Sequence, residues 1–181
     1  MHASLADIIA DVAANSIEAG AKNVRVDFVE SSGGMVSLKV SDDGKGMDAE
    51  TCARAFNPFY TEPGKHDMRK VGMGLPFVKQ TCDACGGEVS LESAKGVGTT
   101  VSCTFRADSI DLPPVGDLAS TAMSLFNFDG DFDLVFRHRK GDAEYSVSRL
   151  ELRDAVGGFD TVDGLSLAKE YLAGQEEGLA S

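Results

Sequence analysis

Two side chains one helical turn apart could carry chemistry near the start of the chain. Asp11 and Asn15 are spaced i, i+4, so they stack on one flank of a predicted helix, beside its apolar stripe. An amide oxygen can ligate Mg²⁺, which prefers oxygen ligands. A carboxylate one turn away can orient or deprotonate a nucleophile. Taken alone, the pair is more typical of an ordinary polar helix boundary.

A second candidate segment follows a predicted strand and comprises Asp42-Asp43-Gly44-Lys45-Gly46-Met47. Two glycines separated by one residue let the backbone come close to a flat ligand. A carboxylate at the end of the strand can accept a hydrogen bond from an exocyclic amine such as that of adenine. Because Asp-Gly is also a frequent turn dipeptide, the segment alone is weak evidence for a site.

A third segment, Gly72-Met73-Gly74-Leu75, closes a long loop and opens a predicted helix. The free N–H groups and the dipole at a helix N-terminus suit phosphate. The loop before it, residues 57–73, lacks periodicity and has the length of a functional lid. It contributes the densest cations of the first half, namely Lys65, Arg69 and Lys70. A solvated loop is the alternative interpretation.

A fourth segment, Gly96-Val97-Gly98-Thr99-Thr100, lies between two predicted strands. It is typical of a hairpin turn before a β-branched strand, whether or not a ligand binds there. Each segment has an ordinary structural explanation, so their order along the chain is the informative feature.

Hydrophobic periodicity predicts the elements that would position these segments. Apolar residues at i, i+3, i+4 and i+7 from Leu5 indicate an amphipathic helix that ends at Gly20. Alternating apolar and polar residues indicate strands. The further expected elements are strands at 24–30, 35–40, 87–92 and 99–106, helices near 48–55, 74–85 and 116–126, a hairpin at about 132–148, and one or two terminal helices.

The charge of the chain is unevenly distributed. The 181 residues carry 17 Lys and Arg and 29 Asp and Glu, a formal net charge of −12. Residues 1–107 hold 14 acids and 11 bases, whereas residues 108–181 hold 15 acids and 6 bases. We therefore expect an almost balanced unit at 1–107 and an acidic one at 108–181. Nonspecific nucleic-acid binding is not expected, because it needs a basic surface.

Apolar runs, cysteines and histidines bear on where the chain works. No run approaches the roughly 20 apolar residues of a membrane span, and the first residues lack the basic region of a signal peptide. Cys52, Cys82, Cys85 and Cys103 are too few for a disulfide scaffold, so a cytoplasmic location is expected. Cys82 and Cys85 are interpreted as packed helix cysteines, and His138 as a surface histidine at a hairpin end.

The four segments, with Asn57-Pro58-Phe59 between the second and third, resemble the ATPase superfamily of DNA gyrase B, heat-shock chaperones, sensor histidine kinases and MutL. The resemblance covers about residues 4–106. It implies a Bergerat-type two-layer α/β sandwich, in which a mixed sheet carries helices on one face and a lid covers ATP. Here a small C-terminal α+β appendage would follow. The implied cofactors are ATP and Mg²⁺.

The resemblance also implies a role for each matched residue. Asn15 would bind Mg²⁺, and Asp11 would be the base that activates water. Asp42, rather than Asp43, would bind adenine, and Thr99 would support that site. The implied nucleotide-binding set further comprises Gly44, Gly46, Met47, Lys65, Arg69, Gly72, Met73, Gly74 and Leu75.

Different parts of the chain resemble different branches of the superfamily. Residues 15–21 are similar to MutL, and Glu18 stands where histidine kinases usually carry a cation that touches phosphate. Residues 57–61 and 72–79 are similar to a histidine-kinase catalytic domain. Only a few residues precede the first helix, so no phosphoacceptor histidine in cis is expected. A MutL-type repair protein is disfavoured, because residues 108–181 offer no basic surface.

Two functions follow as hypotheses. The first is a stand-alone histidine-kinase-like or anti-sigma-type catalytic domain, which slowly hydrolyses ATP or transfers its γ-phosphate to a partner protein. The second is a nucleotide-gated protein-binding module with little or no catalysis. In either case we expect residues 108–181 to dock a partner with a basic patch, in an association that weakens as salt rises.

Overall fold

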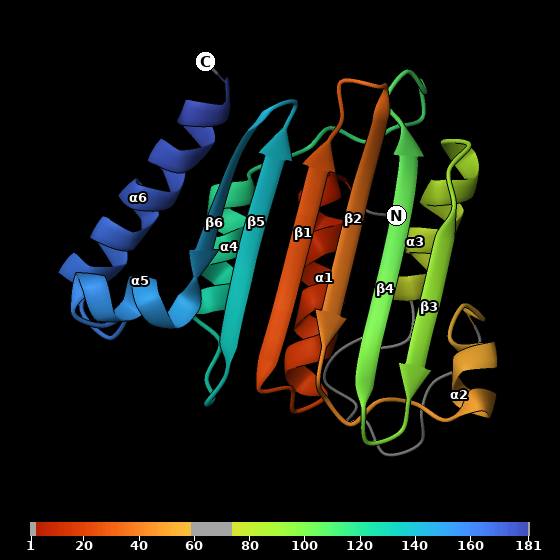
Figure 1. The fold of residues 1–181 in the computed structure, drawn as a ribbon, viewed down its shortest axis with the longest axis horizontal. Helices are drawn as coiled ribbons and strands as arrows, with labels where there is room; N and C mark the ends of the chain where they lie inside the picture. The colour runs from red at the N-terminus through yellow and green to blue at the C-terminus, as the bar shows by residue number, and fades with distance from the viewer. Residues whose placement is uncertain (1–2, 59–73, 181) are drawn as a thin grey trace.

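A six-stranded mixed sheet organises the computed structural model of the chain, which describes residues 3–58 and 74–180 (Figure 1). The strands lie in the order β3-β4-β2-β1-β5-β6, and only β1 and β5 are parallel neighbours. The strands are β1 (Asn23–Glu30), β2 (Met35–Asp42), β3 (Val89–Ala94), β4 (Gly98–Arg106), β5 (Asp133–Lys140) and β6 (Ala143–Ser148). The described helices are α1 (Leu5–Glu18), α2 (Ala49–Arg54), α3 (Gly74–Ala84), α4 (Leu118–Phe126), α5 (Arg149–Val156) and α6 (Val162–Ala180).

Among the described residues, helices cover one face of the sheet and leave the other open. Val24, Val26 and Phe28 on β1 are buried, whereas Arg25 between them is exposed. The same alternation holds on β2 and β5. Helices α1, α3 and α4 lie behind the sheet in Figure 1, on the side of the buried residues. The expected fold class, a mixed sheet with helices on one face, is therefore confirmed.

Helix α1 is fixed at its start and along its apolar face. The Ser4 hydroxyl accepts a hydrogen bond from the Asp7 N–H, and the Asp7 carboxylate accepts one from the Ser4 N–H, which together form a capping box. The buried face of α1 packs against β1, β2, α3 and α4. Because this packing fixes the rotation of the helix, it also fixes the direction of the polar flank that carries Asp11 and Asn15.

The chain after residue 108 continues the same sheet. β5 pairs in parallel with β1, from the pair Asn23–Asp133 to the pair Glu30–Lys140, and β6 adds to β5 as the edge strand. Helix α4 packs against both α1 and α6. The division of the chain at 107/108 stays a prediction, and the sheet runs across it.

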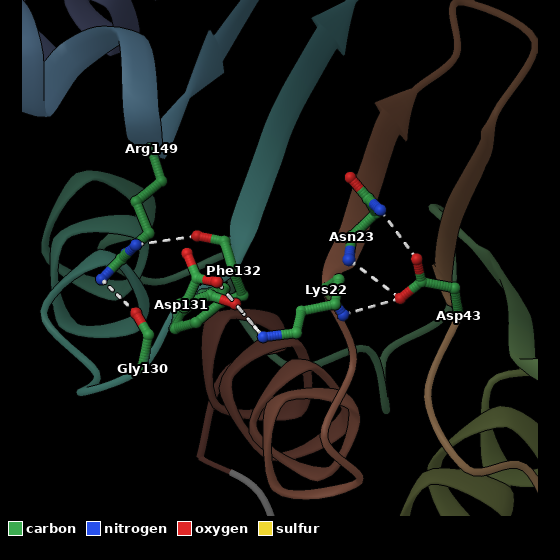
Figure 2. A network of polar contacts seen from close by, with 7 residues as sticks. All are labelled: Lys22, Asn23, Asp43, Gly130, Asp131, Phe132 and Arg149. Atoms are coloured by element: carbon green, nitrogen blue, oxygen red, sulfur yellow. Dashed lines mark hydrogen bonds and ion pairs between the residues drawn. The ribbon is translucent and has the colours of Figure 1, made fainter.

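Arg149 fastens the start of α5 to the loop after α4 (Figure 2). Burial lowers the pKa of its guanidinium, and four backbone acceptors compensate for the lost water. These acceptors, at 2.7–3.4 Å, are the carbonyl oxygens of Phe126, Phe128, Gly130 and Phe132. Lys22 Nζ donates to the Asp131 carbonyl oxygen at 3.0 Å, so the same loop is tied to the start of β1.

His138 is buried, so the expectation of a surface histidine is wrong. Only 2% of the residue is exposed, and its Nδ1 and Nε2 lie 3.0 Å from Glu176 Oε1 and 3.1 Å from Glu30 Oε1. The alternation of β5 places His138 on the same side as Leu134 and Phe136. The carboxylates that bond it come from β1 and α6, far away in the sequence, which local patterns do not reveal.

The four cysteines are free thiols, and Cys82, Cys85 and Cys103 are buried. The thiols of Cys82 and Cys103 are hydrogen-bonded to each other. This bond lowers the pKa of Cys82 and raises that of Cys103. Cys82 and Cys85 are therefore packed cysteines, as expected. Among the described helices, none has the length and apolar character that a membrane span requires.

Candidate functional site

The carboxylate of Asp42, at the end of β2, is held from two sides. Ser16 Oγ on α1 donates to Asp42 Oδ2 at 2.6 Å, and the Gly44 N–H donates to Oδ1 at 2.8 Å. Hydrogen bonds to an ionised acceptor are strong and directional, so these two donors fix the orientation of the carboxylate. Carboxylate oxygens have lone pairs for further donors, such as an amine of a ligand.

The neighbouring acid, Asp43, is engaged in holding the sheet together (Figure 2). It accepts hydrogen bonds from Lys22 N at 2.7 Å, Asn23 N at 2.9 Å and Asn23 Nδ2 at 2.7 Å. The bonds from Asn23 hold the pKa of Asp43 below its usual value. Asp43 therefore fastens the turn after β2 to the start of β1, whereas Asp42 is bonded to α1.

Two glycines allow the turn after β2 to approach β3 and β4 closely. At Gly46 the φ angle is +62°, and a Cβ would lie 2.0 Å from the Ala94 carbonyl oxygen. At Gly98 the φ angle is +135°, and a Cβ would lie 2.0 Å from the Asp42 carbonyl oxygen. Both positions need a conformation and a close contact that only glycine permits. The second and fourth candidate segments are thus in direct contact.

Ser93, on β3, links Met47 to Thr99. The Met47 N–H donates to Ser93 Oγ at 2.8 Å, and Ser93 Oγ lies 2.9 Å from Thr99 Oγ1. Thr99 on β4 is in register with Asp42 on β2 and with Ser93 on β3. Asp42, Met47 and Thr99 therefore meet at one end of the sheet.

The start of α3 lies beside the polar flank of α1. A Cβ added to Gly74, the first residue of α3, would lie 3.8 Å from Asp11 Oδ2 and 3.9 Å from Asn15 Nδ2. Asp11 is exposed and Asn15 is partly buried. The first turn of a helix has N–H groups without intrahelical partners, so a carboxylate, an amide and backbone donors converge here. Leu75 packs against the core behind this point.

Four of the predicted site residues lie outside the described part of the chain. They are Lys65, Arg69, Gly72 and Met73. Their assignments, like that of the lid, stay predictions. Of the other predicted residues, Asp42 is bonded to Ser16 on α1, and Gly74 lies beside Asp11 and Asn15 on the same helix.

The residues on the α1 flank fit the Mg²⁺ ion that the resemblance implies. Mg²⁺ usually takes one or two protein oxygens and completes its shell with water and substrate phosphates. Asn15 offers an amide oxygen, and Asp11, one turn earlier, offers a solvent-exposed carboxylate. Within residues 3–58 and 74–180, no group of three or more His, Cys, Asp or Glu could hold a metal.

Sequence reasoning missed two positioning residues, Ser16 and Ser93. Each occupies a position where the local pattern calls for an apolar residue. Ser16 lies on the buried side of α1, one turn after Val12, and is only 5% exposed. Ser93 follows Val89 and Leu91 on the covered side of β3. A polar residue on an otherwise apolar face was the sequence signal that could have pointed to both serines.

Comparison with known proteins agrees with the geometry. Residues 2–109 match the family model described as "Histidine kinase-, DNA gyrase B-, and HSP90-like ATPase". Sensor histidine kinase YvrG of Bacillus subtilis is 29% identical over 101 residues, which cover 55% of this chain and 17% of that protein. The DNA mismatch repair protein MutL of Bacillus licheniformis is 30% identical over 113 residues, 58% of this chain and 17% of that protein. The chain thus spans about a sixth of these relatives.

A solved structure, the N-terminal domain of a DNA repair protein, shares the fold. It has a TM-score of 0.58 and 15% sequence identity, and the match covers 90% of this chain and 58% of that one. The likeness in fold therefore extends beyond residues 2–109. The fold and the family match together define an ATPase domain of the Bergerat type. The family model covers more than half of the chain, and the chain belongs to the histidine kinase-, DNA gyrase B- and HSP90-like ATPase family.

Proposed function

We propose that this protein binds ATP with Mg²⁺ and either hydrolyses it slowly or transfers its γ-phosphate to a partner protein. One observation carries the proposal: α1 contacts both ends of a candidate nucleotide site. Ser16 is hydrogen-bonded to Asp42, which ends β2. One turn earlier, Asp11 and Asn15 face Gly74 at the start of α3. The adenine base and the phosphates would thus meet residues that α1 carries or holds in place.

Each residue has a definite role in this proposal. Asp42 accepts a hydrogen bond from the adenine amino group, and the Gly44–Met47 turn brings backbone close to the base. The N–H groups of residues 72–75 would bind phosphate oxygens, and Lys65 and Arg69 would contribute positive charge. Asn15 holds Mg²⁺, which neutralises phosphate charge when it is bound.

The carboxylate of Asp11 is what distinguishes a catalytic site from one that only binds ATP. A carboxylate can take a proton from an attacking water or hydroxyl group, whereas an amide in its place cannot. The side chain of Asp11 is exposed at the start of α3, so water or a partner side chain can reach it. This exposure supports a general-base role without assigning the acceptor of the phosphate.

The acceptor, in the transfer version of the proposal, belongs to a partner protein. His138 is buried and bonded at both ring nitrogens, so it does not suit phosphate transfer. It is the one histidine in the described part of the chain. The partner is expected to carry a basic patch that meets the acidic residues of 108–181, in the cytoplasm.

Turnover of γ-labelled ATP by the purified protein tests the hypothesis that the protein hydrolyses ATP or transfers its γ-phosphate. We expect slow release of phosphate, or label on an added partner, and a loss of about 100-fold or more in Asp11→Asn. The matched control is Asp142→Asn, at the exposed turn between β5 and β6. If the wild type binds ATP but neither hydrolyses nor transfers it, this hypothesis fails.

The alternative is a nucleotide-gated protein-binding module. It is favoured by Glu18, which stands where histidine kinases usually carry a phosphate-binding cation, and by the acidity of residues 108–181. In this case nucleotide changes the exposure of a docking surface, and catalysis is incidental. Protection of residues 57–73 from protease by a nonhydrolysable ATP analogue would support it. Partner binding that is equal with and without nucleotide would contradict it.

A further inference from the structure

Three polar side chains form a row on the covered face of the sheet. Asp42, Thr99 and Ser93 lie on the neighbouring strands β2, β4 and β3, and Thr99 is the register partner of both others. Residues directly opposite each other on paired strands point to the same face. The hydroxyl of Thr99 therefore lies between a carboxylate and a second hydroxyl.

The hydrogen bonds of Ser93 decide the direction of the Thr99 hydroxyl. Ser93 Oγ lies 2.8 Å from Met47 N, 2.9 Å from the Gly98 carbonyl oxygen and 2.9 Å from Thr99 Oγ1. A serine hydroxyl has one hydrogen and two lone pairs. The Met47 N–H can only donate and the Gly98 carbonyl can only accept, so Ser93 gives its hydrogen to Gly98. All three contacts are then hydrogen bonds only if Thr99 donates to Ser93.

We propose that Ser93 determines base specificity by holding Thr99 as a hydrogen-bond acceptor beside the acceptor Asp42. Because the Thr99 hydrogen is used on Ser93, only its lone pairs remain for a ligand or a bridging water. Two adjacent acceptors suit a purine with an exocyclic amine, which has two hydrogens to donate. They disfavour a 6-oxo purine, which presents another acceptor at the same position. This inference rests on the proposed nucleotide binding at Asp42.

Equilibrium binding of ATP and of ITP, its 6-oxo counterpart, tests the inference. The quantity to compare is the ratio of the two Kd values. In Ser93→Ala the Thr99 hydroxyl is free to rotate and donate, so we expect the preference for ATP to fall about threefold to tenfold, the range for one neutral hydrogen bond. Ser93→Thr keeps a hydroxyl and should restore the preference.

The matched control is Ser90→Ala, because Ser90 is exposed on the same strand and faces the open side of the sheet. A second variant, Thr99→Val, removes the hydroxyl that Ser93 orients. It should lower the preference by a similar factor, and the double variant should lower it no further.

This design distinguishes failure of the proposed nucleotide binding from failure of the role given to Ser93. If the wild type binds neither nucleotide, the proposed function fails. If it binds ATP in preference to ITP and Ser93→Ala leaves the ratio unchanged, or if the two substitutions act additively, the role of Ser93 is wrong while nucleotide binding stands.

Discussion

Ser16 Oγ donates a hydrogen bond of 2.6 Å to Asp42 Oδ2, and this contact joins the first helix to the end of β2. Ser16 is 5% exposed, so the bond is shielded from water. Hydrogen bonds to charged groups contribute more than neutral ones, because the ionised partner loses more solvation when it is left unpaired. The orientation of Asp42 therefore depends on a residue that does not itself need to touch a ligand.

Replacing Ser16 by Ala is expected to weaken ATP binding about tenfold, which corresponds to about 1.4 kcal/mol. The change removes one of the two donors that orient Asp42, while the bond from the Gly44 N–H remains. Fluorescence titration with a labelled ATP analogue measures the effect. Ser37→Ala, on the open side of β2, should bind as the wild type does. Equal affinity in Ser16→Ala and wild type would contradict the role of Ser16.

Asp43 should make the stability of the protein depend on pH in acid, below about pH 4. The hydrogen bonds from Asn23 lower the pKa of Asp43 in the folded state. Its contribution is therefore complete above the unfolded pKa of about 3.9 and is lost as the pH falls through the lower folded pKa. Asp43→Asn should show a flatter dependence of the urea midpoint on pH below about 4. Parallel curves for the two proteins would show that Asp43 does not contribute in this way.

Gly98 should be irreplaceable, in contrast to nearby Gly96. A Cβ at Gly98 would lie 2.0 Å from the Asp42 carbonyl oxygen, whereas Gly96, with φ +78°, has nothing within 4 Å. Gly96→Ala carries only conformational strain of about 1–2 kcal/mol. Gly98→Ala should cost more than about 3 kcal/mol in the free energy of unfolding, because β2 and β4 must separate. Thermal or urea unfolding of both variants makes the comparison, and equal losses would contradict the packing argument.

His138 should be a stabilising residue. It bonds Glu30 and Glu176, and its ring lies 5.1 Å from that of Phe28, so its removal leaves two carboxylates without this partner and opens a cavity. His138→Ala should lower the free energy of unfolding by about 2–4 kcal/mol. Arg139→Ala, the exposed neighbour, should change it by less than about 0.5 kcal/mol. A loss in His138→Ala no larger than that control would contradict the structural role.

Much of the fold was predictable because the relevant signals are local. The apolar spacing from Leu5 predicted α1, and alternation predicted which residues of β1 and β2 are buried. These periodicities reflect helix and strand geometry and need no knowledge of distant residues. The order of the glycine segments also predicted the family, which the match over residues 2–109 confirms.

Distant partners decided what local patterns could not. The family resemblance singles out Asp42 over the adjacent Asp43, and the structure gives the physical difference: Asp42 bonds Ser16 on α1, whereas Asp43 bonds the start of β1. Similarly, His138 looks like a surface residue until β5 pairs with β1 and α6 supplies Glu176. The sequence determined the elements and the chemical groups of the site. Only the tertiary structure shows which of these groups hold the fold together, because hydrogen-bond partners far apart in the chain depend on packing.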